Sequence, residues 1–218
     1  VVVSDAVEVR RINTLGDNRL MNIAEASKVV TEIYSPPRIA PWAPKVGLRR
    51  GHSIDITVND PYDNKPWDLN LEHKRKRLRE MIRVQRPSLV IGSPCCTAFS
   101  QLQRLNQGKG NEADRQKFLE ESISHVAFIC EIYEEQRKND RYFLHEHPST
   151  ATSWNLDCVK GIMNKKGVQT VVAHMCAFGM TSVGPKGEGP VMKPTRFMTN
   201  SPKLAERLEK KCDKSHEH

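Results

Sequence analysis

Short β-branched runs alternate with longer charged stretches along the chain from Lys28 onward. The apolar runs predict strands over 28–34, 53–58, 88–93, 141–146 and 168–175. Two segments between them, 71–85 and 113–137, repeat apolar residues every three or four positions, which predicts amphipathic helices. Strands that alternate with helices are typical of an α/β fold with a parallel sheet and crossover helices.

Polar residues add detail to the two predicted helices. Asn111 stands just before the helix at 113–137 and is placed to cap its N-terminus. The helix at 71–85 carries the basic run KRKRLR at 74–79. A charged helix face is commonly solvated, and the alternative is that this face binds nucleic acid phosphates. The sequence leaves both interpretations open.

The pattern divides the chain into three parts. Residues 1–27 have no clear period and are interpreted as an N-terminal extension. Residues 28–202 hold the alternating pattern and are interpreted as one domain, with a glycine- and proline-rich loop predicted at 177–190. Residues 203–218 are interpreted as a basic C-terminal helix or tail.

Composition narrows the class of protein and of partner. The 218 residues are 38% hydrophobic and 28% charged, which favours a folded core over disorder. No apolar run is long enough to span a membrane and no secretory signal is visible, so we expect a soluble protein without membrane contact. A net charge of +8, from 34 basic and 26 acidic residues, favours polyanionic partners such as nucleic acid.

The six cysteines indicate the compartment. Their spacing is irregular, and Cys95 and Cys96 are adjacent, which suits neither a secreted disulfide framework nor a paired zinc ribbon. We therefore expect a reducing intracellular compartment, the nucleus or the cytoplasm.

The segments 86–103 and 142–154 carry the most chemistry. In the first, an apolar strand leads into a Pro-Cys loop, and in the second, another strand delivers a carboxylate. We expect Cys96 and Glu146 to face one cleft, with Cys95 pointing elsewhere.

These segments resemble a known family. PCCTAFS (94–100) resembles the Pro-Pro-Cys-Gln-x-Phe-Ser motif of DNA cytosine-5 methyltransferases, and FLHEHP (143–148) resembles their Glu-Asn-Val or Glu-Asn-Pro motif. TEIYSPPRIAPWAPKVGLRRG (31–51) is similar to their first cofactor motif, and VMKPTRFMTN (191–200) to a later motif that ends in an arginine. The resemblance is collinear over about 28–202, which it identifies as a methyltransferase-like catalytic domain.

The resemblance implies a fold and a reaction. The fold would be the doubly wound, Rossmann-like sheet of S-adenosylmethionine-dependent methyltransferases, and the reaction methyl transfer to cytosine through a covalent cysteine adduct. Cys96 would add to carbon 6 of the base as the nucleophile, and Glu146 would orient the base. Arg196 would hold the base carbonyl and lower the thiol pKa. The target base would flip out of its duplex, with DNA a more probable partner than RNA.

The resemblance also implies a cofactor site for S-adenosylmethionine. Its residues would be Tyr34, Ser35 and Pro94, together with Asp55 for the ribose hydroxyls and Asp68 for the adenine amino group.

Several positions depart from the family pattern. Ser35-Pro36-Pro37-Arg38 replaces the glycines of the first motif, and Thr97, His147, Met192 and Pro194 replace polar residues of the others. We expect no target recognition domain within this chain. The alternative function is a catalytically degenerate module that binds nucleic acid or supports assembly within a retroelement-type polyprotein. A methyltransferase that acts on RNA is a third possibility.

The sequence assigns no metal ion. Cys212, His216 and His218 form a C-x3-H-x-H cluster with ligand types suited to zinc, but no clear fourth ligand accompanies them. His145 and His147 are expected to point to opposite faces of their strand, which argues against a shared ion.

Overall fold

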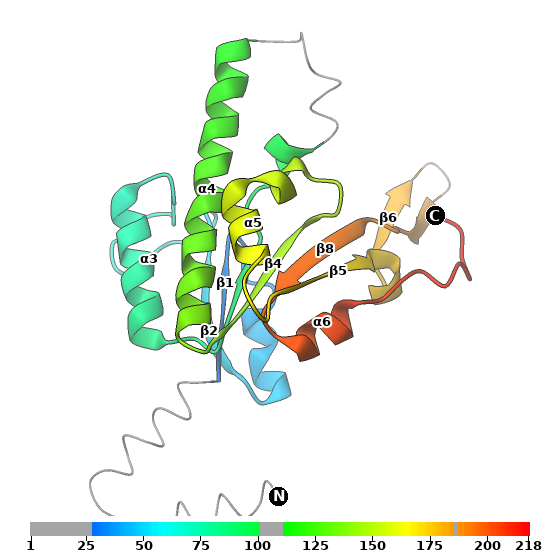
Figure 1. The fold of residues 1–218 in the computed structure, drawn as a ribbon, viewed down its shortest axis with the longest axis horizontal. Helices are drawn as coiled ribbons and strands as arrows, with labels where there is room; N and C mark the ends of the chain where they lie inside the picture. The colour runs from blue at the N-terminus through cyan, green and yellow to red at the C-terminus, as the bar shows by residue number, and fades with distance from the viewer. Residues whose placement is uncertain (1–27, 101–110, 185–186) are drawn as a thin grey trace, which may run out of the picture.

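Six strands form one mixed sheet in the order β2-β1-β3-β4-β8-β5 (Figure 1). The computed structural model describes residues 28–100, 111–184 and 187–218, so the predicted extension at 1–27 lies outside the described residues. The first four strands are parallel, whereas β8 is antiparallel to both of its neighbours. The fold is α/β with helices on both faces, as predicted, but its sheet is mixed. The strands are β1 (Val29–Ile33), β2 (Arg49–Ile54), β3 (Leu89–Gly92), β4 (Tyr142–Pro148), β5 (Gln169–His174) and β8 (Pro194–Thr199).

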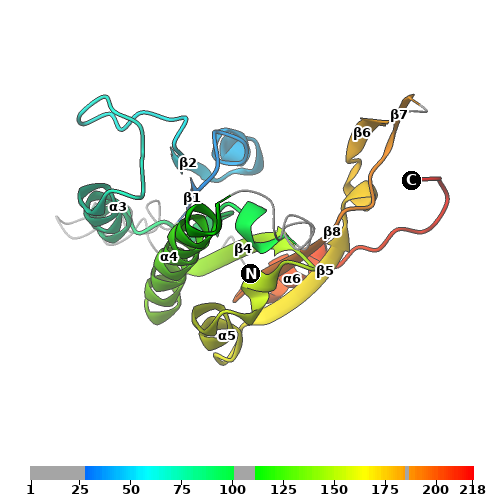
Figure 2. The same cartoon turned by 90° about the horizontal axis from the view of Figure 1, so that it is seen from above.

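The helices cover the two faces of this sheet unequally (Figure 2). Apolar residues of α3, α4 and α5 pack over one face, against Val90, Phe143 and Met198. The opposite face, with Leu144 and Phe197, is covered by parts of η2 and α6. The α-helices are α3 (Glu72–Gln85), α4 (Glu112–Lys138), α5 (Asp157–Met163) and α6 (Pro202–Leu208), and the 3-10 helices are η2 (Ala40–Val46), η3 (Thr97–Phe99), η5 (Thr152–Asn155) and η6 (Met175–Phe178). None of the helices in the described ranges is long and apolar enough to cross a lipid bilayer.

Four of the predicted strands are confirmed, as β1, β3, β4 and β5. The prediction over 53–58 is wrong for most of its length, because β2 ends at Ile54 and Asp55 begins a turn by accepting hydrogen bonds from the backbone N–H and hydroxyl of Thr57. The polar letters of Arg49–Ile54 conceal this strand because it lies at the edge of the sheet and is largely exposed.

Both predicted helices are confirmed, as α3 and α4. The side chain of Asn111 accepts a hydrogen bond from the backbone N–H of Ala113, so the predicted N-cap is also confirmed. The loop predicted at 177–190 contains a hairpin of β6 (Thr181–Gly184) and β7 (Gly187–Pro190). In the segment 203–218, α6 ends at Leu208 and the residues beyond it form no further helix.

The strand order fixes the edge at which a ligand site is expected. The chain passes from β1 to β2 on one side and then returns to place β3 on the other side of β1. In open α/β sheets, ligands bind beyond the carboxyl ends of the strands where the order reverses in this way. The loops that follow β1 and β3 flank that point.

Candidate active site

The carboxyl edge of the parallel strands gathers most of the residues that the sequence singled out. Asp55 follows β2, Tyr34 and Ser35 follow β1, Pro94 and Cys96 follow β3, and Glu146 lies in the last part of β4. Because these four strands are neighbours in the sheet, their loops lie in the same order along one edge.

Glu146 influences the thiol of Cys96 electrostatically. Burial raises the pKa of the Cys96 thiol, and the nearby Cys95 and Glu146 raise it further. Burial also raises the pKa of the Glu146 carboxyl. Cys95 is exposed, and its thiol donates a hydrogen bond to the Thr97 hydroxyl at 3.3 Å. The site therefore holds a half-buried thiol and a carboxyl, and burial raises the pKa of both groups.

The cation of this site is Lys193, which the sequence analysis did not name. Its ammonium lowers the pKa of both Cys96 and Glu146, against the effect of burial. Arg196, expected in this role, instead places its guanidinium carbon 5.1 Å from the ring centroid of Trp154. Arg196 on β8 lies opposite His147 on β4 in the register of these antiparallel strands. Because side chains alternate along a strand, Arg196 and His147 lie on one face of the sheet and Glu146 lies on the other.

His147 fixes the Cys96 loop to β4. The ring is buried, its Nε2 donates to the Pro94 carbonyl at 2.8 Å, and its Nδ1 accepts from the Ser153 hydroxyl at 2.6 Å. Pro94, expected to touch a cofactor, thus uses its carbonyl to bind β4. Burial lowers the pKa of His147 and so favours the neutral ring, whereas the hydrogen bond to Pro94 has the opposite effect.

The expectation that His145 and His147 diverge is wrong. Residues two apart on a strand share a face, and these ring centroids lie 4.8 Å apart. The fully buried His145 donates from Nδ1 to the Tyr133 hydroxyl at 3.0 Å, and Tyr133 donates to the Gly92 carbonyl. His145 Nε2 is buried without a hydrogen-bond partner, so the pair forms part of the packed interior beneath the site.

The loop after β1 is organised by Glu32, a buried carboxylate that the sequence analysis missed. It accepts hydrogen bonds from the backbone N–H groups of Arg38, Ile39 and Ala40, and from the hydroxyls of Ser35 and Ser53. A carboxylate can replace glycine as an organiser of this turn because it satisfies several loop donors at once. Ser35, expected to bind a cofactor, therefore donates its hydroxyl to Glu32.

Tyr34 contacts His125 of α4, and Asp68 influences the same histidine through its charge. The Tyr34 hydroxyl lies 3.0 Å from His125 Nδ1, and His125 Nε2 lies 2.9 Å from the Asn70 side-chain oxygen. Burial, followed by the charge of Arg75, lowers the pKa of His125, whereas the carboxylate of Asp68 raises it. The sequence predicted both Tyr34 and Asp68 at the site, but not His125, which contacts Tyr34 and Asn70.

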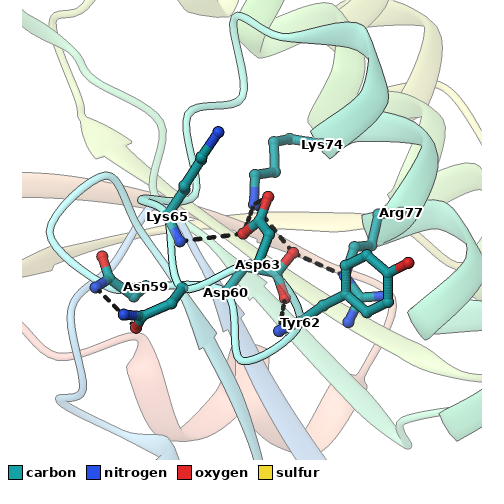
Figure 3. Close-up of polar contacts among 8 residues, drawn as sticks. Asn59, Asp60, Tyr62, Asp63, Lys65, Lys74 and Arg77 are labelled. Atoms are coloured by element: carbon teal, nitrogen blue, oxygen red, sulfur yellow. Dashed lines mark hydrogen bonds and ion pairs between the residues drawn. The ribbon is translucent and has the colours of Figure 1, made fainter.

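Most of the basic side chains in the run at 74–79 make contacts within the molecule. Lys74 is buried and its ammonium lies 3.1 Å from Asp60 and 2.7 Å from Asp63 (Figure 3). Arg77 also binds Asp60, and Arg79 binds Glu72 and Glu131. These contacts hold the segment that carries Asp68 and Asn70 against α3. Lys74, Arg77 and Arg79 are therefore paired within the molecule, whereas Lys76 of the same run is exposed.

A scan against protein-family models finds no match for the chain, and a search of curated proteins finds none either. The arrangement of side chains at the carboxyl edge of the sheet therefore has to carry the functional argument.

Proposed function

We propose that this chain is a DNA cytosine-5 methyltransferase-like domain in which Cys96 is the nucleophile. The single observation that carries the proposal is the meeting of a thiol, a carboxyl and an ammonium group, from Cys96, Glu146 and Lys193, at the carboxyl ends of β3 and β4. The resemblance of PCCTAFS and FLHEHP to the family motifs points to the same pair.

Each group has a defined role in the proposal. Carbon 5 of cytosine is a weak nucleophile, and addition of a thiolate to carbon 6 makes it electron-rich. The protonated carboxyl of Glu146 donates to the ring nitrogen and stabilises the charge that develops during this addition. Lys193 favours the thiolate form of Cys96. After transfer, a solvent water takes the carbon 5 proton, and the electron pair of that C–H bond re-forms the ring double bond and expels the thiolate, which releases the methylated base.

The site offers suitable groups for the nucleoside half of the proposed cofactor but few free groups for the other half. Asp55 and Asp68 are acceptors suited to the ribose hydroxyls and adenine amine, and both carboxylates are partly accessible. At the other end, the backbone donors of Arg38, Ile39 and Ala40 are already bound to Glu32. S-adenosylmethionine, when bound, would supply an electrophilic methyl group. We expect weak cofactor binding, dominated by the nucleoside half.

The same loop supports a second candidate, a degenerate module that binds nucleic acid or supports assembly without catalysis. Pro36 and Arg38 stand where a methyltransferase has glycines, and the raised pKa of Cys96 reduces its thiolate fraction at neutral pH. Neither feature helps methyl transfer.

Two measurements separate these candidates. Calorimetric titration with S-adenosylhomocysteine tests the cofactor loop directly, and a saturable heat supports the enzyme. A duplex that carries 5-fluorocytosine, incubated with S-adenosylmethionine, should then trap Cys96 covalently, because fluorine at carbon 5 blocks the final elimination.

Two serine variants make the trapping experiment specific. Cys96→Ser should abolish the adduct, whereas Cys95→Ser, a change of the same kind one residue away, should retain it. No heat and no adduct would favour the degenerate module. An adduct that survives Cys96→Ser would place the nucleophile elsewhere.

A further inference from the structure

Four potential metal ligands converge where the C-terminal segment meets the end of β5. They are Cys176 in η6 and Cys212, His216 and His218 in the segment after α6, and their ligand atoms all lie within 4.8 Å of one another. The sequence supplied only the last three, because Cys176 stands 36 residues before Cys212. The fold supplies the fourth ligand.

Four of the six separations among these atoms match a tetrahedral zinc site. With Zn–S near 2.3 Å and Zn–N near 2.05 Å, a tetrahedron requires about 3.6 Å between sulfur and nitrogen and about 3.3 Å between two nitrogens. Cys212 Sγ lies 3.6 Å from His216 Nε2 and 3.5 Å from His218 Nε2. The two Nε2 atoms are 3.2 Å apart, and Cys176 Sγ lies 3.4 Å from His218 Nε2.

The surroundings of the four ligands support the same interpretation. The backbone N–H of Lys214 donates to Cys212 Sγ at 3.3 Å, an outer hydrogen bond that holds this sulfur in orientation. His216 directs its other nitrogen, Nδ1, toward the Ser215 hydroxyl, which in turn donates to Asp213. An outer partner on the second ring nitrogen is what fixes a ligating histidine in orientation.

We propose that Cys176, Cys212, His216 and His218 bind one Zn²⁺ ion as a structural site. Two thiolates and two imidazoles suit zinc and disfavour magnesium and calcium, which prefer oxygen. Four protein ligands leave no open position for substrate, which is typical of a structural rather than a catalytic site.

The site would tether the C-terminal segment to the sheet. This segment runs back from α6 toward the β6–β7 hairpin (Figures 1 and 2), and Glu217 and His218 line a groove with that hairpin. The backbone N–H of His174 already donates to the Lys210 carbonyl, and that of Cys212 donates to His174 Nδ1. Met175, next to Cys176, donates to the Met192 carbonyl, so an ion here would also brace the residues that lead to Lys193.

Titration of the reduced, metal-stripped chain with Co²⁺, and then with Zn²⁺, tests the proposal. We expect one Co²⁺ per chain, with the intense visible bands of tetrahedral cobalt and thiolate-to-cobalt charge transfer, both lost when Zn²⁺ displaces it. Saturating Zn²⁺ should raise the melting temperature by about 5–10 °C, because it binds the folded chain preferentially.

Single variants assign the ligands. Cys176→Ser and Cys212→Ser should each weaken Co²⁺ binding at least tenfold and reduce the charge-transfer band, and His216→Ala and His218→Ala should weaken binding. Cys95→Ser and His73→Ala, which alter exposed residues outside the cluster, should bind as the parent does, and circular dichroism would confirm that each metal-free variant is folded. An octahedral cobalt spectrum, tetrahedral binding unchanged in Cys176→Ser, or no binding by the reduced folded chain would each overturn the proposal.

Discussion

The reactivity of Cys96 depends on a balance between opposing influences on its pKa. Burial, Cys95 and Glu146 raise the pKa, and the ammonium of Lys193 lowers it. Because alkylation at neutral pH proceeds through the thiolate, its rate reports this balance without any substrate.

Lys193→Gln should slow alkylation of Cys96 by iodoacetamide at neutral pH, because loss of the ammonium raises the pKa of the thiol and lowers its thiolate fraction. Glu146→Gln should accelerate the reaction, because it removes a negative charge. Peptide mass spectrometry measures the rate at this residue from pH 7 to 9. Lys203→Gln on α6 removes the same charge elsewhere and should leave the rate unchanged; an equal slowing in that variant would show that only net charge matters.

His145 should make the fold sensitive to acid. Burial, with a smaller contribution from His147, holds the pKa of His145 well below its usual range. The unfolded chain therefore binds a proton near pH 6.5 that the folded chain does not. The stability from this residue is present above pH 6.5 and is lost progressively as the pH decreases below it.

Urea unfolding at pH 7, 6 and 5 tests this sign. His145→Asn retains a donor for Tyr133 but does not titrate, so its stability should be lower at pH 7 and should fall less toward pH 5. His73→Asn, at an exposed position, should keep the slope of the parent. Parallel curves for the parent and His145→Asn would refute the assignment.

At the scale of elements, Lys74 joins α3 to the segment that follows β2. Its ammonium is the buried partner of Asp60 and also binds Asp63, and its side chain is only 1% exposed (Figure 3). Removal of one partner leaves buried charge with less compensation. Lys74→Met should lower the free energy of unfolding by about 3 kcal/mol or more.

Denaturant unfolding of Lys74→Met beside Lys76→Met checks this prediction. Lys76 lies two positions away on the same helix and is exposed, so its replacement should change stability by less than about 0.5 kcal/mol. Similar losses in both variants would mean that the ion pairs do not hold the segment.

This helix also shows what the sequence could and could not predict. Its apolar spacing located α3 correctly, because the buried residues Leu78 and Ile82 obey the helical period. The partners of its basic residues could not be predicted, since Asp60 and Glu131 reach α3 only through the tertiary fold. In the candidate site, too, some residues could be predicted from the sequence and others could not.

The local motifs located Cys96 and Glu146, because each follows or ends an apolar strand. Lys193 and Glu32 escaped notice because nothing in the residues beside them distinguishes their charges from those of the surface. Their roles depend on the folded chain: Lys193, just before β8, acts on Cys96 after β3 and on Glu146 in β4, and Glu32 binds a turn six to eight residues further on.

At the scale of the whole molecule, some of the basic side chains form ion pairs with acidic neighbours and others do not. Several cations of α3 are neutralised by acidic neighbours, including Arg79 and Arg83. Arg49 and Arg50 on the edge strand β2 are exposed, and none of the ion pairs among the described residues involves them. If the chain binds nucleic acid, unpaired cations of this kind should supply the phosphate contacts.

We therefore expect binding to a DNA duplex to weaken steeply with salt, because each phosphate contact releases counterions. Replacement of both Arg49 and Arg50 by Gln should reduce affinity at low salt and lower the slope of log K against log salt by about 2, close to 0.9 for each lost contact. The double change Arg79→Gln and Arg83→Gln removes the same net charge from paired positions, so it should alter the slope far less. Fluorescence anisotropy across a salt series measures both slopes. Equal slopes in the two double variants would show that overall charge, rather than the edge strand, attracts the nucleic acid.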